Sequence, residues 1–308
     1  MPSISVILCT YNRAENLKDT LLALKKQDIR SSKLSLEILV IDNNSKDHTK
    51  EVVLHESTDS PYPIRYVFES SQGKSFALNR GIQEASGDLL LFTDDDIVPP
   101  TNWVSTMNEA CVEYHADCFG GKVLPLWLDT PPDWITSQTL KRNVNGILAM
   151  LDYGDSVITA TPGSDENFLF GCNIGFRKEV FNEVGLYRTD IGPTAGKLSR
   201  GEDTEMMKRV LTAGKKAVYV PSIHVLHKVE KERMTLKYAR KRRFDGGVSD
   251  YQRLVTNKKR IPLWYYRECI QLLLTAWWLY LRGKIEIAID RELGFWNHLG
   301  RIVGAHQK

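Results

Sequence analysis

Runs of apolar and β-branched residues alternate with amphipathic segments along the first hundred residues of the chain. The uninterrupted apolar runs predict buried strands, which we expect at 4–11, 36–43, 64–69 and 89–94. The segments between them show helical leucine spacing or cap residues, and we expect helices at 16–27, 49–56 and 75–85. Apolar strands joined by helices indicate a mostly parallel sheet that is covered on both faces.

Pro99 and Pro100 end this regular alternation. Beyond them we expect a helix at 103–115, a strand at 118–128, an irregular segment at 129–167, regular structure at 168–185, a helix at 200–214 and a strand at 216–227. From about residue 233 onward the chain is expected to be helical. A chain of 308 residues is long enough for one large domain with an appendage.

Polar clusters follow three of the predicted strands at their carboxyl ends. These clusters are Thr10–Arg13, Asp42–Ser45 and Asp94–Asp96. In open sheets of this kind, ligands bind at the carboxyl ends of the strands. Three clusters that converge on one edge of the sheet therefore predict a ligand site at that edge.

The three consecutive carboxylates Asp94, Asp95 and Asp96 have two interpretations. They could form a strand-end turn with solvated charges, or they could bind a hard divalent cation, which uses one or two carboxylates together with substrate phosphate oxygens. In an extended segment Asp94 and Asp96 share a side, and Asp95 lies opposite. We therefore expect Asp96 to bind the metal with Asp94 in support, and we expect Asp95 to tolerate substitution best.

The first two clusters fit a nucleotide. Thr10 offers a hydroxyl, Tyr11 an aromatic face and Arg13 a cation. Asp42 can accept a hydrogen bond from a base or a ribose, although each cluster alone would be an ordinary turn or cap. The sequence has neither the glycine-rich fingerprint of dinucleotide-binding folds nor a P-loop, which argues against both classes.

Further candidate chemistry lies near the end of the predicted catalytic region. Gly201-Glu202-Asp203 precedes an amphipathic helix, where acids are common because the helix dipole favours them. A carboxylate placed there could instead deprotonate an acceptor hydroxyl as a general base. His224 and His227 end the strand at 216–227, and a histidine there is often structural, but near a metal it could complete the coordination.

Bulk properties exclude several classes of protein. A net charge of +3 predicts no polyelectrolyte partner, and we expect no nucleic-acid binding. Five widely spaced cysteines without metal-finger or CxxC spacing indicate reduced thiols of a cytosolic protein. The N-terminus has no signal-peptide pattern, and the uncharged run at 269–281 is shorter than the ~20 residues of a membrane-spanning helix.

Six segments, taken in order, resemble the family 2 inverting glycosyltransferases with the GT-A fold. They span about residues 2–228 and read ISVILCTYNR, LEILVIDNNSKD, QGKSFALNRGIQEASGDLLLFTDDDIVPP, FGCNIGFRKEVFNEVG, GEDTEMMKRVLTAG and VYVPSIHVLH. The resemblance implies a Rossmann-like, mixed and mostly parallel α/β sheet with helices on both faces. It also implies a catalytic domain at 1–230, with a nucleotide-binding half at 1–100 and an acceptor-binding half at 101–230, before a helical extension at 231–308.

Carried over by position, the resemblance implies three sets of functional residues. The nucleotide and donor set comprises Thr10, Tyr11, Asn12, Arg13, Asp42, Asn44, Lys74, Asn79, Asp94 and Asp95. The set for Mn²⁺ or Mg²⁺ comprises Asp94, Asp96 and His227. The catalytic base is Asp203 with Glu202 beside it, and the sugar and acceptor pocket is shaped by Gly171, Cys172 and Asn173.

One position departs from the family pattern. Leu78 stands where many relatives have an arginine that is thought to help hold the donor. Lys74 or Arg80 could compensate for the missing cation.

The implied activity is a single displacement that transfers a sugar from a nucleotide-diphosphate sugar to an acceptor hydroxyl. UDP is the expected nucleotide, while GDP and dTDP stay open. The acceptor would be a saccharide or a lipid-linked saccharide in polysaccharide, lipopolysaccharide or other glycoconjugate synthesis. Two alternatives are a nucleotidyltransferase, which normally needs a glycine-rich loop after the first strand, and a sugar-nucleotide-binding or scaffold protein on an inactive GT-A fold.

The segment 231–296 combines basic stretches at 237–243 and 257–260 with many aromatic residues. It could be a helical hairpin that packs on the catalytic domain. It could equally be an interfacial surface, with cations on anionic lipid and aromatic rings at the headgroup level. The second reading predicts a cytoplasmic protein that contacts the inner face of the cell membrane.

Overall fold

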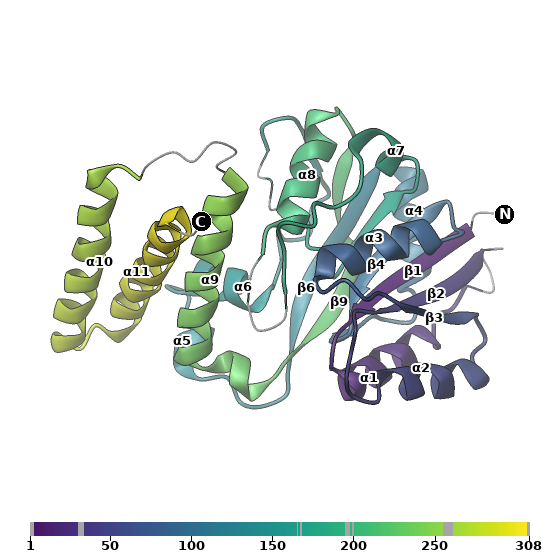
Figure 1. The fold of residues 1–308 in the computed structure, drawn as a ribbon, viewed down its shortest axis with the longest axis horizontal. Helices are drawn as coiled ribbons and strands as arrows, with labels where there is room; N and C mark the ends of the chain where they lie inside the picture. The colour runs from purple at the N-terminus through teal and green to yellow at the C-terminus, as the bar shows by residue number, and fades with distance from the viewer. Residues whose placement is uncertain are drawn as a thin grey trace. The chain divides into compact units, whose positions relative to one another are not determined.

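The computed structural model contains the four apolar strands that the sequence predicts: β1 (Ser3–Thr10), β2 (Ser35–Asp42), β3 (Ile64–Phe68) and β4 (Leu89–Asp94). The structure describes residues 3–29, 34–164, 166, 168–194, 198, 200–254 and 261–306. The four strands pair in parallel in the order β3-β2-β1-β4 (Figure 1). Because Thr10 pairs with Asp42 and Cys9 with Asp94, the carboxyl ends of the three inner strands are level and bring the polar clusters to one edge.

Helices cover both faces of these parallel strands. α1 (Ala14–Leu24) and α2 (Thr49–Thr58) lie on one face, and α3 (Lys74–Glu84) lies on the other (Figure 1). α3 approaches β1 closely at Gly81, where an added Cβ would lie 2.4 Å from Cγ2 of Ile7. Since side chains alternate between the faces of a strand, two covered faces explain why the strands are apolar throughout.

Beyond β4 the sheet becomes antiparallel. It continues through β8 (Ile174–Arg177), β6 (Cys118–Trp127), β9 (Ala217–Val229) and β5 (Ile97–Val98), while β7 (Ile158–Ala160) pairs with β9. The pairs β4–β8, β8–β6, β9–β5 and β9–β7 are antiparallel. A mixed sheet with helices on both faces confirms the predicted fold class.

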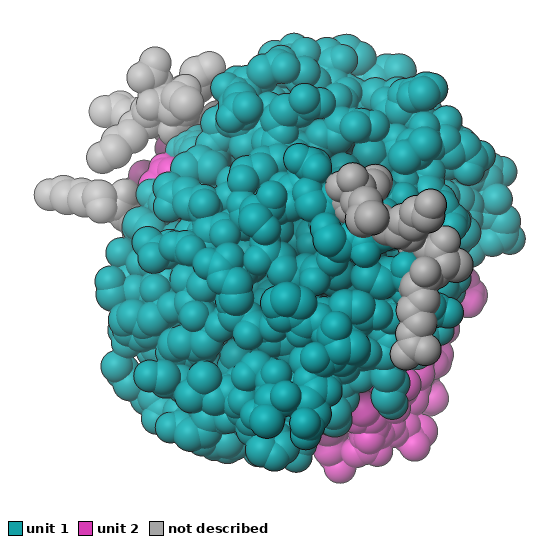
Figure 2. Space-filling model, turned by 90° about the vertical axis from the view of Figure 1, so that its right-hand side faces the viewer, with its two compact units in different colours: residues 1–125, 151–189, 202–228 teal, residues 126–150, 190–201, 229–308 magenta. Residues whose placement is uncertain are grey.

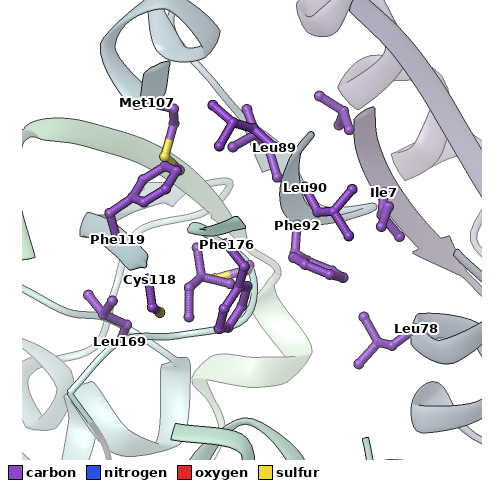
Figure 3. Close-up of a cluster of buried hydrophobic side chains, with 14 of the residues drawn as sticks. Ile7, Leu78, Leu89, Leu90, Phe92, Met107, Cys118, Phe119, Leu169 and Phe176 are labelled. Atoms are coloured by element: carbon purple, nitrogen blue, oxygen red, sulfur yellow. The ribbon is translucent and has the colours of Figure 1, made fainter. Parts of the chain in front are cut away.

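Aromatic side chains pack where the parallel and antiparallel strands meet. Phe92 of β4 and Phe176 of β8 make an edge-to-face contact with ring centroids 5.7 Å apart. Phe119 of β6 belongs to the same buried cluster (Figure 3). An added Cβ at Gly175 would lie 2.4 Å from the ring of Phe119, so the absence of a side chain there lets the ring pack on β8. This core fixes the ends of β4 and β8, which flank the predicted site.

Further helices follow the antiparallel strands in the chain: α4 (Trp103–Glu113), α7 (Val180–Val184) and α8 (Glu202–Thr212). The prediction of irregular structure at 129–167 was wrong in part. That segment contains α5 (Asp133–Thr136), α6 (Lys141–Leu148) and β7. Helices this short are marginal alone, and α6 is stabilised by burial of its apolar side in a core that the local sequence does not reveal.

The chain divides into two compact units (Figure 2). Unit 1 comprises residues 1–125, 151–189 and 202–228, and unit 2 comprises 126–150, 190–201 and 229–308. Unit 2 thus includes two interior segments in addition to the whole of the predicted C-terminal extension at 231–308. The functional division at residue 230 stays a prediction.

The C-terminal part of unit 2 is helical, as predicted: η1 (Lys231–Met234), α9 (Leu236–Leu254), α10 (Leu263–Leu281) and α11 (Ile285–His306). α11 packs against both α9 and α10. Within the described ranges, no helix is both long and apolar enough to cross a bilayer. The predicted basic stretch at 257–260 lies outside the described residues.

Candidate active site

The loops after β1 and β2 are tied together by two asparagines in the left-handed region. Asn12 has φ 52° and Asn44 has φ 66°, a conformation that asparagine tolerates better than most residues. The Asn12 N–H donates to Oγ of Ser45 at 2.9 Å, and Asn12 Oδ1 accepts from the N–H of Lys46 at 2.6 Å. The Oδ1 of Asn44 accepts from Nζ of Lys46 at 2.8 Å. The two predicted nucleotide clusters therefore form one connected edge.

Asp42 is buried at this edge and is held in place by two donors. Its Oδ1 accepts from the Ser45 N–H at 2.9 Å, and its Oδ2 accepts from the hydroxyl of Tyr66 at 2.8 Å. Burial, together with this bond to the carboxylate, raises the pKa of Tyr66 well above its usual range. Each carboxylate oxygen keeps a further lone pair, so Asp42 can still accept from a nucleoside. Tyr11, which follows Thr10, the residue that pairs with Asp42, is partly exposed.

The acidic stretch is a turn, and the expectation of an extended segment was wrong. Asp95 and Asp96 form the turn between β4 and β5, so the strict alternation of sides does not apply. Asp94 pairs with Nζ of Lys74 at 2.7 Å. Asp95 and Asp96 instead share Nη1 of Arg13, at 3.1 and 2.9 Å.

Asp95 is buried and accepts hydrogen bonds from two threonine hydroxyls. Its Oδ2 accepts from the Thr10 hydroxyl at 2.8 Å, and its carbonyl oxygen accepts from the Thr20 hydroxyl at 2.9 Å. Only 5% of its surface is exposed. Burial and the neighbouring Asp96 carboxylate raise the pKa of Asp95 to about 7, although Arg13 opposes that shift. Asp95 thus links β1, α1 and the acidic turn, although we expected it to tolerate substitution best.

His227, not His224, faces the carboxylates. The β5–β9 pairing sets Ile97 opposite His227, and Nε2 of His227 lies 3.3 Å from Oδ2 of Asp96. His224 is less buried, and its Nδ1 lies 3.2 Å from the carbonyl of Ser222. His227 is thus the histidine beside the acidic turn, and its role as a metal ligand stays a prediction.

The donor set at this turn fits a divalent cation that takes most of its ligands from substrate and water. Among the described residues there is no group of three or more acidic, histidine or cysteine side chains with metal-binding geometry. Asp96 and His227 together supply one carboxylate and one imidazole. Mg²⁺ and Mn²⁺ sites in nucleotide enzymes use few protein ligands together with phosphate oxygens, which is consistent with so small a set. Asp94, which we expected in support, is already paired with Lys74.

Asp203 lies in the first turn of α8, close to the loop before β8. Its Oδ2 accepts from the Gly171 N–H at 3.1 Å. An added Cβ at Gly171 would lie 2.5 Å from both carboxylate oxygens, so this approach requires glycine. The Oδ1 atom is buried without a hydrogen-bond partner among the described residues. Burial raises the pKa of Asp203; the Lys74 ammonium opposes the rise and Asp94 adds to it. A carboxylate with one free oxygen and a raised pKa is suited to accept a proton.

Three of the other predicted positions, Asn173, Asn79 and Cys172, are bonded to or packed among other parts of the protein. Asn173 is buried, accepts from the Trp103 indole at 2.9 Å and donates to the carbonyl of Lys122 at 2.9 Å. Asn79 is bonded through both ends of its amide to the main chain of Tyr187, each at 2.8 Å. Cys172 is buried, and burial raises the pKa of its thiol. Contact of these three with a ligand stays a prediction.

Glu202, the predicted neighbour of the base, is buried at the start of α8. Of the two cations expected to compensate for Leu78, only Lys74 lies near the acidic residues of the site, and its compensating role stays a prediction. Leu78 is in the hydrophobic core, and Arg80 pairs with Glu84 at 2.9 Å on the exposed side of α3. Lys74, in contrast, interacts electrostatically with Asp94, Asp203 and Glu202.

Sequence reasoning missed Tyr66 and Thr20, which fix Asp42 and Asp95. Tyr66 lies inside a predicted strand, and its position near the carboxyl end of that strand was an available signal. Thr20 lies within α1, and only tertiary packing brings it to the acidic turn.

Known protein families match this chain over most of its length. The family model described as glycosyl transferase family 2 matches residues 5–185, and that of glycosyl transferase family group 2 matches residues 129–290. Glycosyltransferase AglE of Haloferax volcanii is 28% identical over 219 residues, covering 70% of this chain and 63% of AglE. The chain thus spans less than two thirds of that relative.

Two further comparisons cover more of both chains. The glucosyl-dolichyl phosphate glucuronosyltransferase of Haloferax volcanii is 23% identical over 254 residues, covering 80% of this chain and 75% of that protein. The solved structure of the mannosyltransferase PcManGT from Pyrobaculum calidifontis, in complex with GDP-Man and Mn²⁺, superposes with a TM-score of 0.60 at 19% identity. That superposition covers 99% of this chain and 86% of the other, and it shows a shared fold.

Proposed function

The chain belongs to glycosyl transferase family 2, whose model matches more than half of its residues, and we propose that it transfers a sugar from a nucleotide-diphosphate sugar to an acceptor hydroxyl with inversion at the anomeric carbon. The proposal rests on Asp203, a buried carboxylate with a raised pKa and one oxygen without a hydrogen-bond partner among the described residues. Such a group can act as the general base that a single displacement needs.

In the proposed reaction Oδ1 of Asp203 accepts the proton of the acceptor hydroxyl. The freed electron pair on that oxygen forms the bond to C1 of the sugar, while the bond from C1 to the diphosphate oxygen breaks. The diphosphate leaves with the bonding electrons on the opposite side of C1, so the anomeric configuration inverts. Gly171 positions the base through its N–H bond to Oδ2, and Lys74 provides positive charge beside Asp94.

The nucleoside is assigned to the connected edge of Thr10, Tyr11, Asn12, Arg13, Asp42 and Asn44. Asp96 and His227 would hold Mn²⁺ or Mg²⁺, with Asp94 nearby. When bound, the metal stabilises the negative charge of the diphosphate leaving group. UDP is the expected nucleotide, and the related structure with GDP-Man makes GDP the first alternative to test.

A panel of UDP, GDP and dTDP sugars, with and without Mn²⁺, tests this function through hydrolysis and thermal stabilisation. We expect one donor to stabilise the protein in a Mn²⁺-dependent manner. Asp203→Asn should lower the transfer rate by roughly 10²–10⁴-fold and leave donor binding nearly unchanged. Asp88→Asn is the matched control, since Asp88 precedes the opposite end of β4. Full activity of Asp203→Asn would overturn the base assignment, and no response to any donor would favour an inactive scaffold.

We also propose that the acceptor is lipid-linked and that α10 contacts a membrane surface. α10 packs inward through Cys269, Ala276 and Leu279. Its other side is exposed and apolar, with Trp277 at 64% and Leu281 at 68% exposure. The same side presents Leu263, Trp264, Leu274 and Trp278. A large exposed apolar face of this kind marks an interaction site, so we assign an occupant to it.

Charge favours anionic lipid over a second copy of the chain as that occupant. Arg267, Arg282 and Lys284 are exposed along and beside the face, and Arg282 lies 4.7 Å from the ring centre of Trp278. Two copies would oppose these cations to each other, whereas anionic headgroups attract them. The basic stretch of α9 contributes less than expected, because Arg240 pairs with Glu292 and Lys241 pairs with Asp245.

Sedimentation with vesicles of phosphatidylcholine and phosphatidylglycerol tests the membrane contact. The double variant Leu274→Ala/Leu281→Ala should bind at least about tenfold more weakly, because each buried leucine side chain is worth about 1.5–3 kcal/mol. Leu54→Ala is the matched control, an exposed helical leucine of unit 1 with 52% exposure. Equal sedimentation of the double variant and the wild type would contradict the assignment to α10.

A further inference from the structure

Two arginines of unit 2 share one carboxylate, and a third, Arg243, lies close enough to interact electrostatically with all three. Nη2 of Arg200 lies 3.2 Å from Oδ2 of Asp250, and Nη2 of Arg301 lies 3.1 Å from the same oxygen. Arg243 is seven residues before Asp250 on α9, two helical turns away on the same side. Arg301 belongs to α11 and Arg200 to the segment before α8. The three guanidinium groups thus come from three separate parts of the unit.

Arg243 has no hydrogen-bond or ion-pair partner for its guanidinium among the described residues. The Nε atoms of Arg200, Arg243 and Arg301 are likewise buried without an acceptor in the described chain. Burial and the positive charges of Arg200 and Arg301 lower the pKa of Arg243 to about 10. This cluster therefore contains more positive charge than its protein neighbours balance.

The nearby carboxylates are already engaged. Asp245 accepts from the N–H of Leu198 and pairs with Lys241, and Asp290 accepts from the amide of Asn143 at 2.6 Å. The sequence stretches 195–199 and 252–260, which continue this part of the chain, contain no aspartate or glutamate. Asp250 and Asp290 attract the Arg243 guanidinium, but together with Arg200 and Arg301 three cations face two carboxylates.

The cluster is held rigidly and stays partly accessible. α9 and α11 pack closely at Gly247 and Gly300, where added Cβ atoms would lie 2.2 Å from the carbonyl oxygen of Asn297 and 2.1 Å from that of Phe244. The side chains of Arg200 and Arg301 keep 34% and 37% exposure. Fixed guanidinium groups with accessible edges match the geometry of phosphate oxygens, which accept several N–H donors at once.

We propose that Arg200, Arg243 and Arg301 form a binding site for a phosphate group within unit 2. The phosphate could belong to a lipid-linked acceptor or to a free anion, and the binding chemistry is the same for both. Arg200 stands three residues before Asp203 in the sequence, which favours the acceptor as the source. This choice of source rests on the proposed function, whereas the phosphate site itself does not.

Thermal unfolding of the full chain with inorganic phosphate, in the presence of EDTA, tests the site. We expect phosphate to raise the unfolding temperature of the wild type. Arg243→Gln should weaken phosphate binding roughly tenfold or more, because it removes charge-assisted hydrogen bonds. Without phosphate, the same variant should be at least as stable as the wild type, because it removes an unbalanced cation. Arg291→Gln is the matched control, an exposed arginine of α11.

A purely structural arginine gives the opposite pattern. If Arg243→Gln unfolds at a lower temperature and keeps the full phosphate response, the proposal is wrong. Absence of any phosphate effect on the wild type also overturns it, unless vesicles of phosphatidylcholine with phosphatidic acid bind in an Arg243-dependent manner. If Arg243→Gln weakens binding to phosphatidic acid vesicles but leaves binding to phosphatidylglycerol vesicles unchanged, the phosphate belongs to a lipid headgroup. Asp203→Asn should keep the phosphate response, so failure of the transferase proposal is separable from failure of this site.

Discussion

The acidic turn after β4 and the arginine cluster around Asp250 carry excess charge of opposite sign. In both regions, residues of opposite charge balance part of that excess. At the acidic turn, Arg13 and Lys74 balance three carboxylates, and Asp203 keeps one oxygen without a partner among the described residues. In the arginine cluster, Asp250 bonds two guanidinium groups and Arg243 is left over. In both regions the incompletely bonded charge is the one that we assign to substrate.

The largest expected effect is on stability. Substitution of a fully bonded charge should lower the free energy of unfolding, whereas substitution of the incompletely bonded Arg243 should not. Asp95→Ala leaves the Thr10 hydroxyl without its acceptor while Arg13 keeps Asp96, and it should lower the free energy of unfolding by about 1–3 kcal/mol. Urea denaturation measures the loss, with Asp88→Ala as the exposed control. If Asp95→Ala is as stable as Asp88→Ala, the turn is not the junction that we describe.

The second test concerns the space around Asp203. Gly171→Ala places a Cβ 2.5 Å from its carboxylate oxygens, so the base must move. A displacement of this size should lower kcat by about a hundredfold while the chain stays folded. Gly146→Ala is the matched control, since an added Cβ there meets nothing within 4 Å. If the two variants have equal initial rates, Asp203 is not the general base.

The smallest expected effect is a shift in the pH profile. A general base works only when ionised, and burial raises the pKa of Asp203. Activity should therefore be lost as the pH falls through a value above the ordinary aspartate pKa of about 3.9. Lys74→Gln removes the cation that opposes the rise, so the acidic limb of kcat/KM should move to higher pH. A limb that stays in place or moves to lower pH would contradict the coupling of Lys74 to Asp203.

The parallel half of the fold was predictable because its strands are uninterrupted apolar runs that end in polar clusters. The same clusters predicted the edge of the site, from Thr10 and Asp42 to Asp94. The turn at Asp95–Asp96 was not predictable, because the local sequence does not reveal that β5 pairs with β9. The arginine cluster was beyond prediction for a related reason, since Arg200, Arg243 and Arg301 meet only through helix packing.

The proton NMR spectrum of the first product tests the central claim most directly. With an active nucleotide sugar and its acceptor, the anomeric coupling of the newly formed glycoside reports its configuration. Single displacement assisted by Asp203 predicts the configuration opposite to that of the donor. A product that retains the donor configuration would contradict both the inverting reaction and the role of Asp203 as its base.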